Sequence, residues 1–133
     1  MDNKQINIGL FGFGTVGKGL YDVLKKIQPE NVSIVKVCVR NVAKHSAEAP
    51  ELEFTSNADD IFTDSRINFI VELIDDAEAA YGIVKRALQA KIPVVSGNKK
   101  MLARHIQEMI QLQRDNDTAL LYDASACGSI PVI

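Results

Sequence analysis

Apolar and polar positions along this chain follow two alternating patterns. Short, mostly apolar runs rich in β-branched residues occur at 6–11, 31–40, 68–74, 92–95 and 118–122, with a shorter possible run at 52–55. Between most of these runs, apolar residues recur every three or four positions, as they do in helices with one buried face. Strands that are apolar on both faces and alternate with helices indicate a parallel sheet covered on both sides. We therefore predict an α/β fold with a doubly wound parallel sheet of about six strands in the order 3-2-1-4-5-6.

The same periodicity predicts which helix positions face the core. The helix after residue 14 places Val16, Leu20, Val23, Leu24 and Ile27 on one face, and helices are also expected over 77–90 and from Lys99 to about Asp115. Residues 58–62 predict a single helical turn with Asn57 as its cap. Residues 41–56 are polar, so we expect an irregular segment with His45 in a solvated loop, while His105 is expected to be half-buried by packing.

Three glycines separate the first predicted strand from the first predicted helix. Gly12, Gly14 and Gly17 have the spacing G-x-G-x-x-G, which in a strand–turn–helix context is typical of the dinucleotide-binding turn of a Rossmann-type fold. In that interpretation Gly12 makes the tight turn, Gly14 lets a pyrophosphate approach the backbone, and Gly17 lets the helix pack on the strand. Thr15 and Val16 then occupy the first helical turn, whose N–H groups attract phosphates. The alternative is a strand-to-helix turn without a ligand.

The end of the second predicted strand bears on the choice of dinucleotide. An acidic residue about 20 positions after the glycines would bind the ribose 2′-hydroxyl of NAD, but no Asp or Glu occurs between Asn31 and Ala47. The strand ends at Arg40, with Lys44 and His45 just beyond it. A guanidinium at that place can pair with the 2′-phosphate of NADP, so the sequence favours NADP over NAD. The alternative is an ordinary solvated basic loop.

Composition narrows the classes of partner. The chain has 133 residues, the size of one domain, with 47% hydrophobic residues, 24% charged residues and a formal net charge of −2. This balance argues against nucleic acid or an anionic membrane as a partner, and no apolar run has the roughly 18 residues of a membrane span. Two cysteines, Cys38 and Cys127, and an N-terminus without signal-peptide features predict a cytoplasmic protein.

Four segments together resemble one enzyme family. Residues 94–103 (VVSGNKKMLA) lie at the carboxyl end of the fifth predicted strand, and residues 9–17 (GLFGFGTVG) carry the glycines. Residues 70–74 read IVELI, and residues 121–133 read LYDASACGSIPVI. In order and spacing they resemble the V-V-T-A-N-K-x-x-L-A, G-L-x-G-x-G-T-V-G, V-E-x-x-G-G and Y-E-A-S-V-x-G-G-I-P-I-I segments of homoserine dehydrogenases. The resemblance covers essentially the whole chain and identifies residues 1–133 as the family's NAD(P)-binding Rossmann domain.

The resemblance implies a reaction and a set of site residues. The family reduces aspartate semialdehyde to homoserine with NAD(P)H on the way to threonine and methionine, and Lys99 matches its active-site lysine. Further residues at matching cofactor-binding positions are Phe13, Leu73, Ile74, Asn98 and Lys99. A weaker match to the family's monovalent-cation site falls on Asp123, Ala126, Gly128 and Ile130. The family also implies a small-molecule substrate and a homo-oligomer. One departure is Asp75-Asp76 in place of the usual Gly-Gly, which is expected to weaken cofactor binding.

Two alternatives stay open at this point. Cys127 follows Ser125-Ala126 and could be the nucleophile of a cysteine-dependent semialdehyde dehydrogenase. The chain could also be a non-catalytic dinucleotide-binding regulatory module. Because it stops in the apolar residues Ile130–Ile133, we expect a truncation before a substrate domain, and therefore an inactive fragment.

Overall fold

The computed structural model describes residues 4–122, which form six strands and five helices. In chain order they are β1 (Ile6–Phe11), α1 (Thr15–Ile27), β2 (Val32–Cys38), α2 (Val42–Glu48), β3 (Phe54–Thr55), α3 (Asp59–Phe62), β4 (Phe69–Glu72), α4 (Ala77–Gln89), β5 (Val94–Ser96), α5 (Lys99–Asn116) and β6 (Leu120–Leu121). Within this range no helix is long and apolar enough to cross a membrane.

The strands form one sheet with the predicted order. Hydrogen bonding arranges them as β3-β2-β1-β4-β5-β6, and the β1–β2, β2–β3 and β5–β6 pairs are parallel. The prediction of a Rossmann-type α/β fold is therefore confirmed. The chain divides into two compact units, Met1–Val71 and Glu72–Ile133, and each unit is described by itself below.

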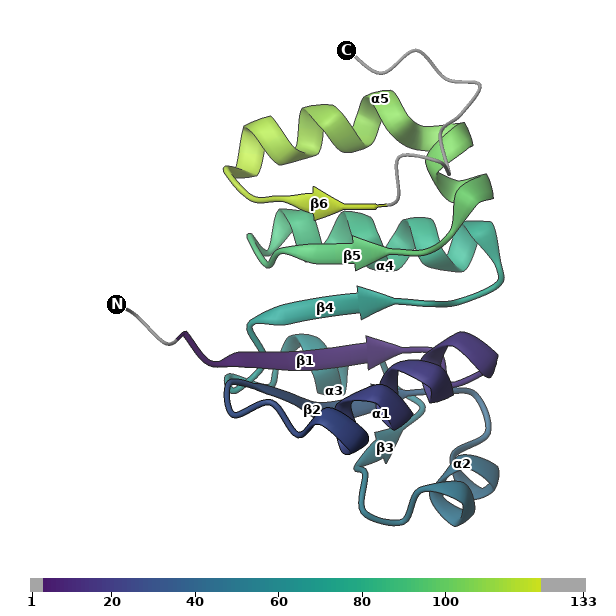
Figure 1. The fold of residues 1–133 in the computed structure, drawn as a ribbon. Helices are drawn as coiled ribbons and strands as arrows, with labels where there is room; N and C mark the ends of the chain where they lie inside the picture. The colour runs from purple at the N-terminus through teal and green to yellow at the C-terminus, as the bar shows by residue number, and fades with distance from the viewer. Residues whose placement is uncertain (1–3, 123–133) are drawn as a thin grey trace. The chain divides into compact units, whose positions relative to one another are not determined.

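In the first unit, helices cover both faces of the strands. Figure 1 shows α1 in front of β1 and β2, and α3 behind them. On the α3 face, Ile61 is 1% exposed and packs where a side chain on Gly9 would lie, because a Cβ at Gly9 would come within 2.6 Å of Ile61 Cγ2. The central strand β1 is buried over its last four residues, as the core strand of such a sheet must be.

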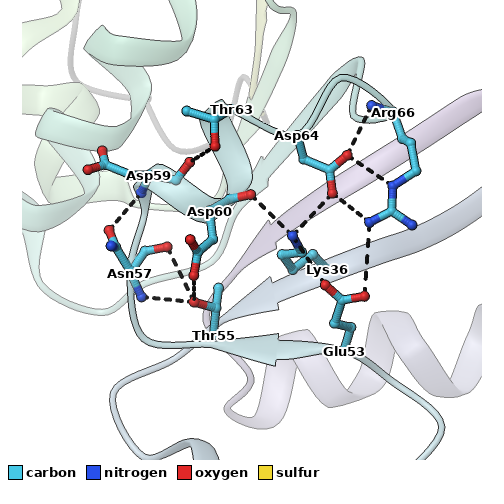
Figure 2. Close-up of polar contacts among 9 residues, drawn as sticks. All are labelled: Lys36, Glu53, Thr55, Asn57, Asp59, Asp60, Thr63, Asp64 and Arg66. Atoms are coloured by element: carbon cyan, nitrogen blue, oxygen red, sulfur yellow. Dashed lines mark hydrogen bonds and ion pairs between the residues drawn. The ribbon is translucent and has the colours of Figure 1, made fainter.

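A network of charged side chains joins β2 to the segment between β3 and β4 (Figure 2). Lys36 of β2 is 13% exposed at its side chain and lies 3.1 Å from carboxylate oxygens of both Glu53 and Asp64, while it donates to the main-chain oxygen of Asp60. Arg66 binds both oxygens of Asp64, at 2.9 Å and 2.6 Å. These pairs lower the pKa of the Asp64 carboxyl group, Arg66 being the largest cause. The half-buried ammonium of Lys36 thus has three oxygen acceptors, from Glu53, Asp64 and Asp60.

In the second unit, α4 and α5 pack together. α4 buries Ala77, Ala80, Val84, Ala87 and Leu88, whose spacing of three or four residues is that of one face of the helix predicted over 77–90. α5 has a kink that the sequence pattern did not predict, since His105 has non-helical backbone angles inside it. The His105 ring stacks on Tyr81 of α4 at 3.9 Å between centroids, which confirms a half-buried packing role for this histidine.

Two predictions about the first unit are wrong. Residues 42–48 form the helix α2 rather than an irregular segment, with Asn41 accepting a hydrogen bond from the Lys44 N–H as its cap. His45 lies in α2 and packs against the rings of Phe13 and Phe54, so it is not in a solvated loop. A seven-residue helix on a polar sequence leaves little periodic signal, and its contacts come from residues distant in sequence.

The predicted apolar face of α1 is also only partly correct. Val16, Val23 and Ile27 are 65%, 51% and 67% exposed in this structure, and the one buried residue of the helix is Gly17. Helical spacing gives the direction of a face, but the close approach of the backbone at Gly17 decides which side of α1 meets the sheet.

The turn between β1 and α1 requires glycine at two positions for folding alone. Gly12 has a φ of 98°, a backbone conformation that residues with a side chain rarely adopt. A Cβ at Gly17 would lie 2.6 Å from the main-chain oxygen of Gly12 and 3.2 Å from its carbon. Because these are backbone atoms, they cannot move aside as the end of a side chain can.

We predict opposite effects of alanine at two glycines of the same helix. Gly17→Ala is expected to destabilise the chain by about 1–3 kcal/mol because of overpacking. Gly19→Ala, where a Cβ meets nothing within 4 Å, is expected to stabilise it by about 0.4–1 kcal/mol through the entropy of the unfolded chain. Urea unfolding of both variants measures the difference, and equal stability of the two would contradict the proposed close contact.

Candidate functional site

Within residues 4–122, no side chain covers the backbone at Gly14 in the glycine turn of the first unit. An ideal Cβ built on Gly14 has no atom within 4 Å, and Thr15 and Val16, the first residues of α1, are exposed. The first intrahelical hydrogen bond runs from Lys18 N–H to Gly14 O, so the N–H groups before Lys18 precede the helical ladder. No acidic residue occupies the first turn of α1. This arrangement suits an anion such as a phosphate.

Phe13 anchors this turn instead of presenting its ring to a ligand. Its side chain is 3% exposed and packs against Tyr21, His45 and Phe54, with ring centroids 5.3–5.9 Å away. α1, α2 and β3 therefore meet around one ring. Although Phe13 was predicted to contact the cofactor, its buried ring leaves only its main-chain atoms for such a contact.

Arg40 lies two residues after β2 and is exposed. It immediately precedes Asn41, the cap of α2. The nearest acid along the chain, Glu48, pairs with Lys18 and with His45 Nδ1, the latter at 2.8 Å. Within residues 4–122 no ion pair engages the Arg40 guanidinium, which leaves it available to a phosphate.

In the second unit, two adjacent acids, Asp75 and Asp76, follow β4 and differ in their contacts. Asp76 caps α4: its Oδ1 accepts hydrogen bonds from the Glu78 and Ala79 N–H groups, at 2.9 Å and 3.3 Å. Asp75 is exposed, and its main-chain oxygen accepts from Asn98 Nδ2 at 3.1 Å. A carboxylate at a helix N-terminus is favourable, so Asp76 has a structural role that the sequence comparison did not reveal.

A buried carboxylate ends β4. Glu72 is fully buried; its Oε1 accepts from Ser96 Oγ and its Oε2 from the Ile74 N–H, both at 2.6 Å. Burial raises the pKa of Glu72, and the hydrogen bonds from Ser96 and Ile74 oppose that rise. Neither Glu72 nor Ser96 was among the predicted site residues. The available signal was that Glu72 is the one charged residue in the apolar run 68–74.

Lys99 is the first residue of α5 and is exposed. The residue before it, Asn98, is 6% exposed and caps α5, with Oδ1 accepting from Met101 N–H at 2.9 Å. Its Nδ2 donates to Ile74 O at 2.8 Å. Leu73 and Ile74 are half-buried in the turn beside it. The structure thus brings together the predicted residues Leu73, Ile74, Asn98 and Lys99 in the second unit.

The remaining predicted positions lie elsewhere. Asp123, Ala126, Gly128 and Ile130, the predicted cation site, and Cys127, the alternative nucleophile, lie outside the described residues. Among residues 4–122 no group of three or more His, Cys, Asp or Glu side chains could hold a metal ion.

Comparisons with known proteins point to one family. The family model described as "Homoserine dehydrogenase, NAD binding domain" matches residues 12–123. The homoserine dehydrogenases of Lactococcus lactis and Helicobacter pylori are each 34% identical to this chain in sequence. The two alignments cover 96% and 98% of this chain, respectively, and 32% of each relative. A crystal structure of the Staphylococcus aureus homoserine dehydrogenase superposes with a TM-score of 0.82 at 27% identity, over 91% of this chain and 33% of that one. The chain therefore spans about a third of the length of the curated relatives it matches.

The two adjacent acids after β4 are expected to differ in their effect on stability. Asp76→Ala removes the cap of α4 and should destabilise the chain by about 1 kcal/mol. Asp75→Ala keeps the main-chain oxygen that Asn98 uses and should change stability by less than about 0.5 kcal/mol. Urea unfolding at pH 7 compares the two variants, and an equal loss for both would contradict the capping role of Asp76.

Proposed function

Because this chain belongs to the homoserine dehydrogenase family, whose NAD-binding domain it matches, we propose that it binds NADP in preference to NAD and supplies the acid for reversible reduction of aspartate semialdehyde. The binding of a nicotinamide dinucleotide follows from the family. Residues 1–133 then form the NAD(P)-binding domain, and the residues that hold the substrate come from a further domain of the full-length enzyme.

The open surface at Gly14 is the observation that carries this proposal. Gly12 and Gly17 are needed for folding, since one has a positive φ and the other touches backbone. Gly14 has neither constraint: its φ is −80°, and a Cβ there would meet nothing within 4 Å. Glycine at this position therefore serves the approach of something outside the chain, and the free N–H groups beside it suit a pyrophosphate.

The chemical role proposed for this chain is to transfer a proton to or from the substrate oxygen and to stabilise the negative charge that develops on it. A bound nicotinamide supplies or accepts the hydride. Lys99, exposed at the start of α5, is proposed to polarise the aldehyde oxygen as an ammonium and to donate a proton to it as negative charge develops. In the direction of homoserine oxidation its neutral amine accepts the hydroxyl proton.

Arg40 supports the preference for NADP. A charge-assisted contact between its guanidinium and the 2′-phosphate would add an interaction that NAD cannot make. The basic residues Lys44 and His45 follow it in α2, and the acid Glu48 already contacts Lys18 Nζ and His45 Nδ1.

Three further features belong to the proposal through the family alone. They are a monovalent cation near Asp123, Ala126, Gly128 and Ile130, a homo-oligomeric full-length enzyme, and a cytoplasmic location. The small-molecule substrate follows from the dehydrogenase family.

We expect Gly14→Ala to separate folding from cofactor binding. The variant should fold, because no atom lies in the way of the methyl group, and its loss of stability should be limited to the preference of a helix N-cap for glycine over alanine. Its affinity for NADPH, measured by fluorescence titration, should fall roughly 10-fold or more, a loss of about 1.4 kcal/mol. Gly19→Ala is the matched control and should keep wild-type affinity. Unchanged affinity in Gly14→Ala would mean that the turn binds no dinucleotide.

Arg40→Ala is expected to remove most of the preference for NADPH over NADH. A charged hydrogen bond of about 1.5–3 kcal/mol corresponds to roughly 10- to 150-fold in affinity. The quantity to measure is the ratio of the two dissociation constants, since the acids at 75 and 76 could weaken both cofactors together. A ratio that Arg40→Ala leaves unchanged would show that Arg40 does not contact the 2′-phosphate.

The 133-residue chain by itself is expected to turn over no homoserine, whereas the full-length enzyme should do so and should lose most of its kcat with Lys99→Ala. A general acid contributes about 10²–10⁴-fold. Lys100→Ala, at the next position of α5, is the control and should keep wild-type turnover. NADP-dependent oxidation of homoserine by the isolated chain would contradict the need for a separate substrate domain.

A further inference from the structure

We propose that Glu72 is a positioning residue for Lys99: its carboxylate, acting through Ser96 and Asn98, holds the turn that begins α5 against the turn that begins α4. The role assigned to Lys99 rests on the proposed function. The hydrogen-bonded connection itself is independent of that function and can be tested without it.

The connection starts at the end of β4 and reaches the end of β5. Glu72 Oε1 accepts from Ser96 Oγ at 2.6 Å, and Ser96 Oγ in turn accepts from the Asn98 N–H at 3.3 Å. The main chains follow the same path, since Gly97 N–H donates to Glu72 O at 3.0 Å. All three side chains are at most 6% exposed. The residue after this path is Lys99.

A second path returns from Asn98 to the turn after β4. Asn98 Nδ2 donates to Ile74 O at 2.8 Å and to Asp75 O at 3.1 Å. The Ile74 N–H donates to Glu72 Oε2 at 2.6 Å, so the two paths close a ring of hydrogen bonds. The remaining acceptor of the amide, Asn98 Oδ1, caps α5 through Met101 N–H. The start of α5 is therefore tied to Glu72 from both sides.

The donors and acceptors match only around an ionised Glu72. Its two oxygens receive one hydrogen each, from the Ser96 hydroxyl and the Ile74 N–H. Ser96 Oγ already accepts from the Asn98 N–H, so its own hydrogen points to Glu72. A carboxamide at position 72 would place a second donor against one of these donors and leave a buried hydrogen without a partner.

Packing alone does not account for this residue. The preceding residues of β4, Ile70 and Val71, are buried with apolar side chains, whereas an isolated buried charge is costly. Through Ser96, Glu72 fixes the orientation of Asn98, and Asn98 in turn fixes the position of the first turn of α5, which carries Lys99. Preorganisation of this kind matters for a proton donor, because a misplacement of about 1 Å can cost on the order of 100-fold in rate.

Residue-resolved hydrogen exchange on the 133-residue chain tests the connection. The Met101 amide reports the Asn98 cap, and the Met109 amide reports the later part of α5. In Glu72→Gln and in Ser96→Ala we expect the Met101 amide to exchange about 10-fold faster, the change that 1.4 kcal/mol produces, while Met109 is unchanged. Glu108→Gln, a charge change on the same helix outside the network, is the control and should leave both amides as in the wild type.

A double-mutant cycle separates the connection from general loosening. If Glu72 acts through Ser96, the double variant Glu72→Gln/Ser96→Ala exchanges at Met101 no more than about twofold faster than either single variant. Fully additive effects overturn the proposal. So do an unchanged Met101 amide in both single variants and an equal acceleration at Met109.

Turnover by the full-length enzyme tests the role toward Lys99. Glu72→Gln should lower kcat for homoserine about 10-fold or more and raise KM for NADP by a smaller factor, because Asn98 and Ile74, two predicted cofactor-binding residues, belong to this network whereas the Gly14 turn does not. Wild-type kcat in Glu72→Gln, with Lys99→Ala inactive, overturns the positioning role while the proposed function stands. Wild-type turnover in Lys99→Ala overturns the catalytic assignment and with it the positioning role, whereas the exchange result still decides whether the connection exists.

Discussion

At the start of α1 the backbone of Gly17 lies so close to the carbonyl of Gly12 that a methyl group would stand 2.6 Å from its oxygen. This contact sets where α1 leaves the sheet and which of its sides faces the strands. It also places the first turn of the helix beside Gly14, whose surface is open. The open surface at Gly14, where we propose that phosphate binds, is thus a consequence of close packing between Gly12, two positions before it, and Gly17, three positions after it.

In the second unit, side chains instead of glycines shape the turns that precede the helices. Two strands end beside each other, and the turns that follow leave main-chain groups that must find partners. Asn98 satisfies groups in both turns, and Asp76 satisfies the first N–H groups of α4. Glu72 and Ser96 complete this hydrogen-bond network with buried polar atoms, since Ser96 Oγ donates to Glu72 Oε1. In the described residues no buried side-chain nitrogen or oxygen lacks a partner, which is what a buried polar network requires to stabilise a structure.

Local features of the sequence were sufficient where a single element decides the outcome. The run 6–11 and the glycine spacing predicted β1 and the turn after it, and the apolar spacing over 77–90 predicted α4 and its buried face. Such predictions succeed because a strand or an amphipathic helix carries its own period. The helix α2 was missed, since its support comes from the contact of His45 with Phe13 and Phe54, which are distant in sequence.

By itself the sequence determined the order of the strands, the glycine turn, and the placement of Lys99 at the start of a helix. Only the tertiary structure decided which side of α1 is buried, that Asp76 caps α4, and that Glu72 reaches Ser96 and Ile74. The reason is physical. Periodicity and turn chemistry are properties of neighbouring residues, whereas burial and hydrogen-bond partners depend on which strand ends the fold brings side by side.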